Sequence, residues 1–104
     1  MPIEIHNPAA PDQIVATYDE TPDNTLDVVV ARARSAQIKW AALPQPERGV
    51  MVANFVNGLE ARAEEIVTSI TVEMGKPLAE ARGEVMKALG EARASVARAN
   101  APIG

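Results

Sequence analysis

The stretch Thr71-Val-Glu-Met-Gly-Lys-Pro-Leu-Ala-Glu-Ala-Arg-Gly-Glu-Val85 constrains the fold more than any other part of this chain. Gly75 stands where an ending helix needs a left-handed residue, and Pro77 stands where a new helix can start, since proline fits the first helical position. One helix therefore stops here and another begins in a new direction. The stretch contains no nucleophile, metal cluster or phosphate loop, so it predicts a structural corner and not a reactive site.

Further start and stop signals divide the rest of the chain into helices. Thr21-Pro22-Asp23 predicts a helix start, with Thr21 as the capping side chain and Asp23 at the positive end of the helix dipole. Pro44 ends that helix, and Pro46 begins the next one. Apolar residues then recur at helical spacing. The predicted helices cover residues 22–42, 46–60, 62–74 and 77–99.

The first residues predict a β-hairpin over residues 3–18. Ile3 and Ile5 alternate with polar neighbours, and the prolines of Asn7-Pro8-Ala9-Ala10-Pro11-Asp12 mark a turn. Residues 13–18 are rich in β-branched and aromatic side chains, which favour a second strand. Two strands alone are marginally stable, so the hairpin must pack on the helices or on another chain. The predicted class is mostly α with a small N-terminal β-hairpin (α+β) and about four helices.

The apolar faces of these helices predict a thin core. The chain has only three aromatic residues, and its 47% apolar content consists mainly of alanine and valine, which bury little area each. The methionines near these faces are expected to fill the core. The predicted inner residues are Leu26, Val29, Val30, Ala33, Trp40, Met51, Val52, Phe55, Val56, Leu59, Ile66, Val67, Ile70, Met74, Leu78, Val85, Leu89, Ala92, Val96 and Ala99. Such helices are expected to need a cover from elsewhere.

Charge and cysteine content exclude several function classes. The net charge is −4, which gives no electrostatic footprint for nucleic acid or anionic lipid. Without cysteine there is no disulfide, thiolate nucleophile or zinc–cysteine site. The N-terminus lacks the pattern of a signal peptide, and no apolar run approaches the roughly 20 residues that span a bilayer. We expect a soluble, cytoplasmic protein without nucleic-acid or membrane partners.

His6 is the only histidine, so it cannot belong to a common metal triad. As a lone base it would lie on a predicted strand beside a turn, where a partly exposed structural role is the favoured interpretation. The serines fall inside predicted helices, so no Ser-His-Asp arrangement can be assembled. His6 therefore predicts no catalytic site.

The carboxylate pairs Glu60/Glu64 and Glu80/Glu84 are spaced four residues apart, so each pair shares one face of a helix. Helices that bind two metals usually supply a Glu-x-x-His element, which is absent here. A solvated face beside basic residues is favoured. Gly75-Lys76-Pro77 could suggest anion binding at a helix N-terminus, but a phosphate loop needs several glycines after a strand. We predict no catalytic, cofactor-binding or metal-binding residue.

Three runs of the sequence resemble the start of NAD(P)-dependent aldehyde dehydrogenases. They are NPAAPDQIVATYDETP, DVVVARARSAQIKWAALPQPER and LEARAEEIVTSITVEMGKPLAEARGEV. The family motifs fall on Asn7-Pro8-Ala9, on Trp40 followed by Pro46-Glu47-Arg48, and on Glu73-Met74-Gly75-Lys76-Pro77 with Glu80-Ala81. The resemblance covers roughly residues 5–90. Two departures are Ala10-Pro11, where the family has Thr-Gly, and the lack of aromatic residues after Val85.

The resemblance implies a part of a larger enzyme. Family members are much longer, and none of their functional residues maps onto this sequence: not the nucleophilic cysteine, the glutamate base, the dinucleotide-binding lysine and glycine-rich turn, or the oxyanion asparagine. Residues 1–104 are then a single partial domain that flanks the cofactor domain. This implies a scaffold fragment that is not catalytic alone and binds neither NAD nor NADP alone. The resemblance leaves the aldehyde and the choice between NAD and NADP unspecified.

Two other hypotheses come from the residues. The first is a helical module that associates with itself or with a partner supplying the missing domain. It rests on Leu78, Val85, Ala92 and Ala99, which repeat at heptad spacing. The second is a small carboxylate–metal protein, based on the paired glutamates.

Overall fold

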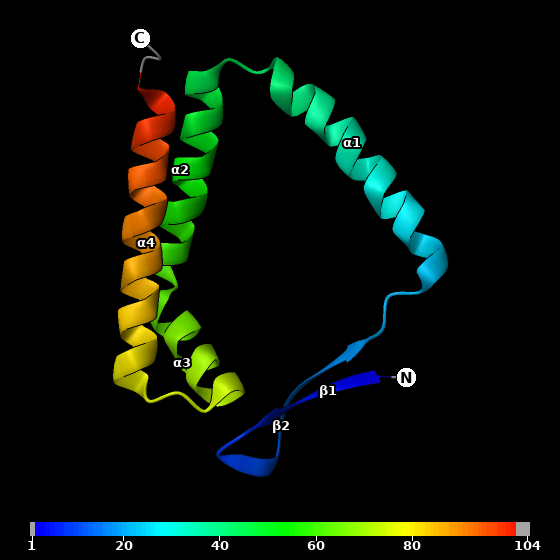
Figure 1. Ribbon diagram of the computed structural model, residues 1–104, viewed down its shortest axis with the longest axis vertical. Coiled ribbons are helices and arrows are strands. Elements are labelled where there is room, and N and C mark those ends of the chain that lie inside the picture. The colour runs from blue at the N-terminus through cyan, green and yellow to red at the C-terminus, as the bar shows by residue number, and fades with distance from the viewer. Residues whose placement is uncertain (1, 102–104) are drawn as a thin grey trace.

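The computed structural model describes residues 2–101, and it confirms the predicted fold class: a β-hairpin is followed by four helices (Figure 1). The hairpin strands are β1 (Pro2–Asn7) and β2 (Ala10–Asp19). A single 3-10 turn, η1 (Asp23–Thr25), precedes the helices. The helices are α1 (Leu26–Ala42), α2 (Gln45–Ala61), α3 (Ala63–Met74) and α4 (Leu78–Asn100).

The two strands pair antiparallel, and the register places Ile3 opposite Tyr18. The pairing becomes irregular toward the turn, where the side chain of Asn7 replaces backbone pairing. Its Oδ1 accepts a hydrogen bond from the Ala9 N–H at 2.9 Å, and its Nδ2 donates to Gln13 Oε1 at 3.0 Å. Asparagine is common in such turns because its side-chain oxygen can accept a hydrogen bond from the backbone N–H two residues further along the chain. Strand β1 packs on α3, so the hairpin contacts the helices, as the sequence predicts.

The start of the first helix differs from the prediction. Thr21 does not cap a helix, and the α-helix begins at Leu26 instead of residue 22. The backbone of Pro22 is extended (ψ 139°), and the 3-10 turn η1 follows it. In that turn Thr25 donates to the Pro22 carbonyl from both its backbone N–H (3.0 Å) and its Oγ1 (2.7 Å). A 3-10 turn of this kind often precedes an α-helix.

The corner between α1 and α2 is an extended dipeptide held by an arginine. Leu43 and Pro44 both have extended backbones, with ψ of 141° and 144°. Arg48 Nη1 reaches back from α2 and donates to the Leu43 carbonyl at 2.5 Å and to the Ala41 carbonyl at 3.3 Å. These carbonyls lie at the open end of α1, which has no intrahelical donors for them. Arg48 therefore fixes the direction in which α1 leaves α2.

The predicted corner at Gly75 is confirmed. Gly75 has φ +74°, and its N–H donates to the Thr71 carbonyl at 2.9 Å, which closes α3. Pro77 immediately precedes α4. A Cβ built on Gly75 would lie 3.3 Å from Pro8 Cβ in the hairpin turn. The glycine therefore serves two purposes: it adopts the left-handed conformation, and it lets the hairpin approach the corner closely.

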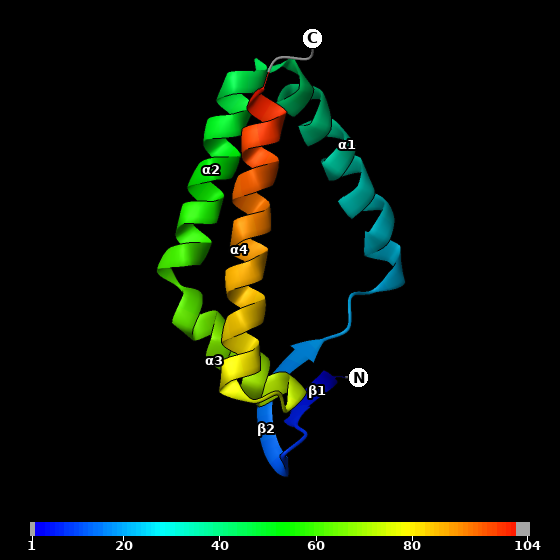
Figure 2. The same cartoon turned by 60° about the vertical axis from the view of Figure 1, so that its left-hand side comes forward.

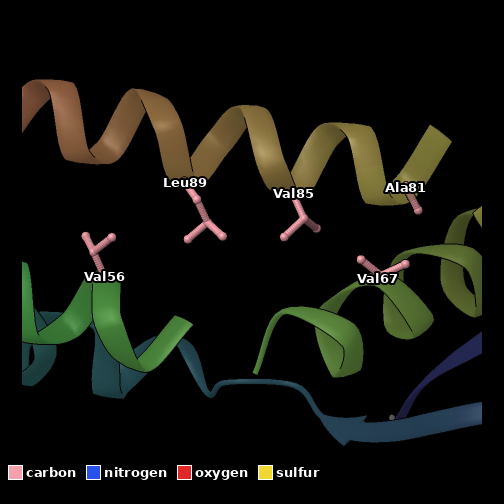
Figure 3. Packing of buried hydrophobic residues seen from close by; sticks show 5 residues of the cluster. All are labelled: Val56, Val67, Ala81, Val85 and Leu89. Carbon is pink, nitrogen blue, oxygen red and sulfur yellow. The ribbon is translucent and has the colours of Figure 1, made fainter. Parts of the chain in front are cut away.

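The core is one small cluster in which α4 packs on α2 and α3 (Figure 3). Ala81, Val85 and Leu89 recur every four residues, so they point from one face of α4 toward Val56 of α2 and Val67 of α3. Alanine and valine supply most of this cluster. The expectation of a thin core is confirmed for the described residues.

Helix α1 lies apart from the other helices and makes the molecule open (Figures 1 and 2). None of its residues is buried, although Leu26, Val29 and Val30 were expected to face a core. The radius of gyration is 18.2 Å, whereas a compact domain of this length would have about 13 Å. The predicted apolar face of α1 therefore exists, but no other element among residues 2–101 buries it.

The expectation that methionines fill the core is wrong. Met51, Met74 and Met86 are 53%, 68% and 61% exposed. The reason is the same as for α1: each lies on a helix face that no other element of the described chain covers.

Candidate functional site

An apolar groove lies between α2 and α4, and we call it the α2–α4 trough. Its upper part has a volume of about 470 Å³ and is lined chiefly by Val52, Phe55, Val56, Leu59, Ala92 and Val96, with Trp40 at its end. A second hollow of about 350 Å³ shares Leu59 and Ala92 with it and continues to Ile66 and Ile70 of α3. The two hollows therefore form one continuous trough along α4.

Polar groups in the upper part of the trough are few: Gln45, Arg48, Ser95 and Asn100. Arg48 is the charged side chain that lines it, and its guanidinium donates to the Leu43 and Ala41 carbonyls. A dinucleotide would need several donors for its phosphates, typically backbone N–H groups at a helix N-terminus after a glycine-rich turn. The trough offers a carbon surface instead. The described residues do not fit NAD or NADP.

The upper end of the trough is closed by a close helix approach. A Cβ built on Gly49 would meet the side-chain amide of Asn100, which is the flexible end of a side chain in the last turn of α4. The C-terminal end of α4 therefore lies beside the beginning of α2. Sequence reasoning missed this contact because Gly49 sits inside a helix pattern, where glycine has no evident local purpose.

Three of the four paired glutamates form ion pairs with basic residues, and two of these ion pairs, those of Glu60 and Glu64, bridge helices. Glu60 forms an ion pair with Arg93, and Glu84 forms one with Lys76. Glu64 accepts two hydrogen bonds from Arg82, at 3.1 and 2.9 Å, and this guanidinium lowers the pKa of the Glu64 carboxyl below its ordinary value. All six side chains are at least partly exposed, so each pair contributes little stability.

The metal hypothesis finds no support in these contacts. Between residues 2 and 101, no three side chains of histidine, aspartate or glutamate gather closely enough to hold a metal ion. The glutamates of the Glu60/Glu64 pair each have an arginine partner, which competes with any cation. The structure favours the interpretation that these glutamates lie on solvated helix faces beside basic residues.

The remaining polar groups of interest are the His6 imidazole and the Thr71 hydroxyl. His6 is exposed in the hairpin, with Nδ1 2.8 Å from the Pro11 carbonyl and Nε2 3.0 Å from Glu4 Oε2. Thr71 Oγ1 is buried without a hydrogen-bond partner among the described residues. A nucleophile needs an activating base within hydrogen-bond reach, and these two groups sit in different elements without such a contact between them. They do not make a catalytic pair.

A helix must have about 20 predominantly apolar residues to cross a bilayer. Within the described part of the chain, no helix is both long and apolar enough to cross a membrane.

Comparison with known proteins identifies the family. The model of the aldehyde dehydrogenase family matches residues 1–103. The α-ketoglutarate semialdehyde dehydrogenase of Haloferax volcanii is 36% identical over 86 residues, which are 83% of this chain and 18% of that enzyme. The α-ketoglutaric semialdehyde dehydrogenase of Bacillus subtilis is 32% identical over 87 residues, which are 84% of this chain and 18% of that enzyme.

A third relative is also a semialdehyde dehydrogenase. The N-succinylglutamate 5-semialdehyde dehydrogenase of Novosphingobium aromaticivorans is 41% identical over 71 residues, which are 68% of this chain and 15% of that enzyme. The chain thus spans less than a fifth of the length of each of these three relatives. The match is consistent with an N-terminal segment, as the sequence motifs indicate. The resemblance found in the sequence is confirmed, and the chain belongs to the aldehyde dehydrogenase family.

Proposed function

We propose that this chain is the N-terminal scaffold of an NAD(P)-dependent aldehyde dehydrogenase, and that the reacting groups lie in sequence outside these 104 residues. Two observations together support the proposal. The family model matches almost the whole chain, yet the trough of that chain is lined by carbon and holds no disengaged charged group. A segment of this kind contributes packing and not chemistry.

The exposed side chains support a packing role. Phe55 is 66% exposed, Val52 39% and Trp40 38%, and all three line the α2–α4 trough. Monomeric proteins rarely expose contiguous apolar patches of this kind, and such patches mark contact surfaces. In the complete enzyme we propose that the remaining dehydrogenase covers this face. The corner at Gly75 and the clamp of Arg48 then set the directions in which the helices meet that body.

We infer that the substrate class is a semialdehyde. The relatives named above act on α-ketoglutarate semialdehyde or N-succinylglutamate 5-semialdehyde, and an Escherichia coli relative, 34% identical over 83 residues, is a succinate-semialdehyde dehydrogenase. These substrates share an aldehyde on a carboxylate-bearing carbon chain. Oxidation of the aldehyde to a carboxylic acid with NAD or NADP would be the reaction of the complete enzyme.

A chimera tests the proposal. The matched segment of the Bacillus subtilis enzyme is replaced by this chain, and NAD(P)H formation is measured with α-ketoglutaric semialdehyde. A matched control carries a designed hairpin–helix segment of equal length but unrelated sequence in the same place. We expect turnover from the chimera and none from the control. A chimera that folds and remains a soluble, cofactor-binding protein but shows no turnover contradicts the scaffold assignment.

A further inference from the structure

We draw no further inference here: the strongest candidate, the α2–α4 trough together with the uncovered apolar face of α1, carries nothing because it is the packing face already described and nothing in the structure shows what covers it.

Discussion

The corner at Gly75 allows a prediction with a worked magnitude. Gly75→Ala forces an L-residue into φ +74°, which costs about 1–2 kcal/mol. Reduced freedom of the unfolded chain offsets about 0.5 kcal/mol of this cost. The new Cβ also lies 3.3 Å from Pro8 Cβ, so the hairpin must shift by a few tenths of an ångström. We expect a net loss of about 1 kcal/mol or more in the free energy of unfolding.

The matched control has the opposite sign. Gly90 lies within α4, and a Cβ built there meets nothing within 4 Å. Gly90→Ala should therefore stabilise the protein by about 0.5–1 kcal/mol, the ordinary gain for a helix interior. Both variants are unfolded with urea and with heat at one protein concentration, followed by circular dichroism. A change of 1 kcal/mol moves the Tm of a domain of this size by roughly 4–8 °C. If both substitutions shift Tm in the same direction, the role assigned to Gly75 is refuted.

Three further predictions follow from the core, the corner of α1 and the ion pairs. Val67→Ala removes two methyl groups from a side chain that is 1% exposed, and should cost about 2 kcal/mol in urea unfolding; a loss below 0.5 kcal/mol would mean that the cluster is not a core. Arg48→Ala frees the end of α1 and should change the radius of gyration in small-angle scattering, while an unchanged value would show that the clamp is dispensable. Because Arg82 lowers the folded-state pKa of Glu64, the pair stabilises the fold above the ordinary carboxyl value of 4.5 and loses this effect as pH falls through the folded value. Carboxyl NMR titration should therefore find a higher Glu64 pKa in Arg82→Gln than in the wild type, and equal values would contradict the contact.

Local sequence signals predicted the helices and strands well, because each signal depends on only a few neighbouring residues. Gly75 and Pro77 define a corner through backbone conformation alone, and the alternation of Ile3 and Ile5 defines a strand through side-chain period alone. These features need no knowledge of the rest of the molecule. The family motifs were recognisable for the same reason, since they lie at such corners.

The failures concern what each helix packs against. A helical stripe predicts an apolar face, but burial depends on whether another element reaches that face. Val85 packs against α2 and α3, whereas no other element of the described chain buries Val29 or Met51. Thr21 failed as a cap because Pro22 has an extended backbone instead of a helical one, so the first turn, a 3-10 turn, begins only at Asp23. The clamp of Arg48 was not predictable, because its acceptors become free only once α1 has ended at Ala42.

We propose that this polypeptide supplies packing surface, and that the residues that oxidise the aldehyde lie outside it. The most direct measurement is NAD(P)H formation by the purified 104-residue chain, with NAD and with NADP, over a panel of semialdehydes. The account predicts a rate equal to that of buffer at every protein concentration. NAD(P)H that accumulates in proportion to the amount of chain, and disappears with Phe55→Glu, would place a working site in the trough and contradict it.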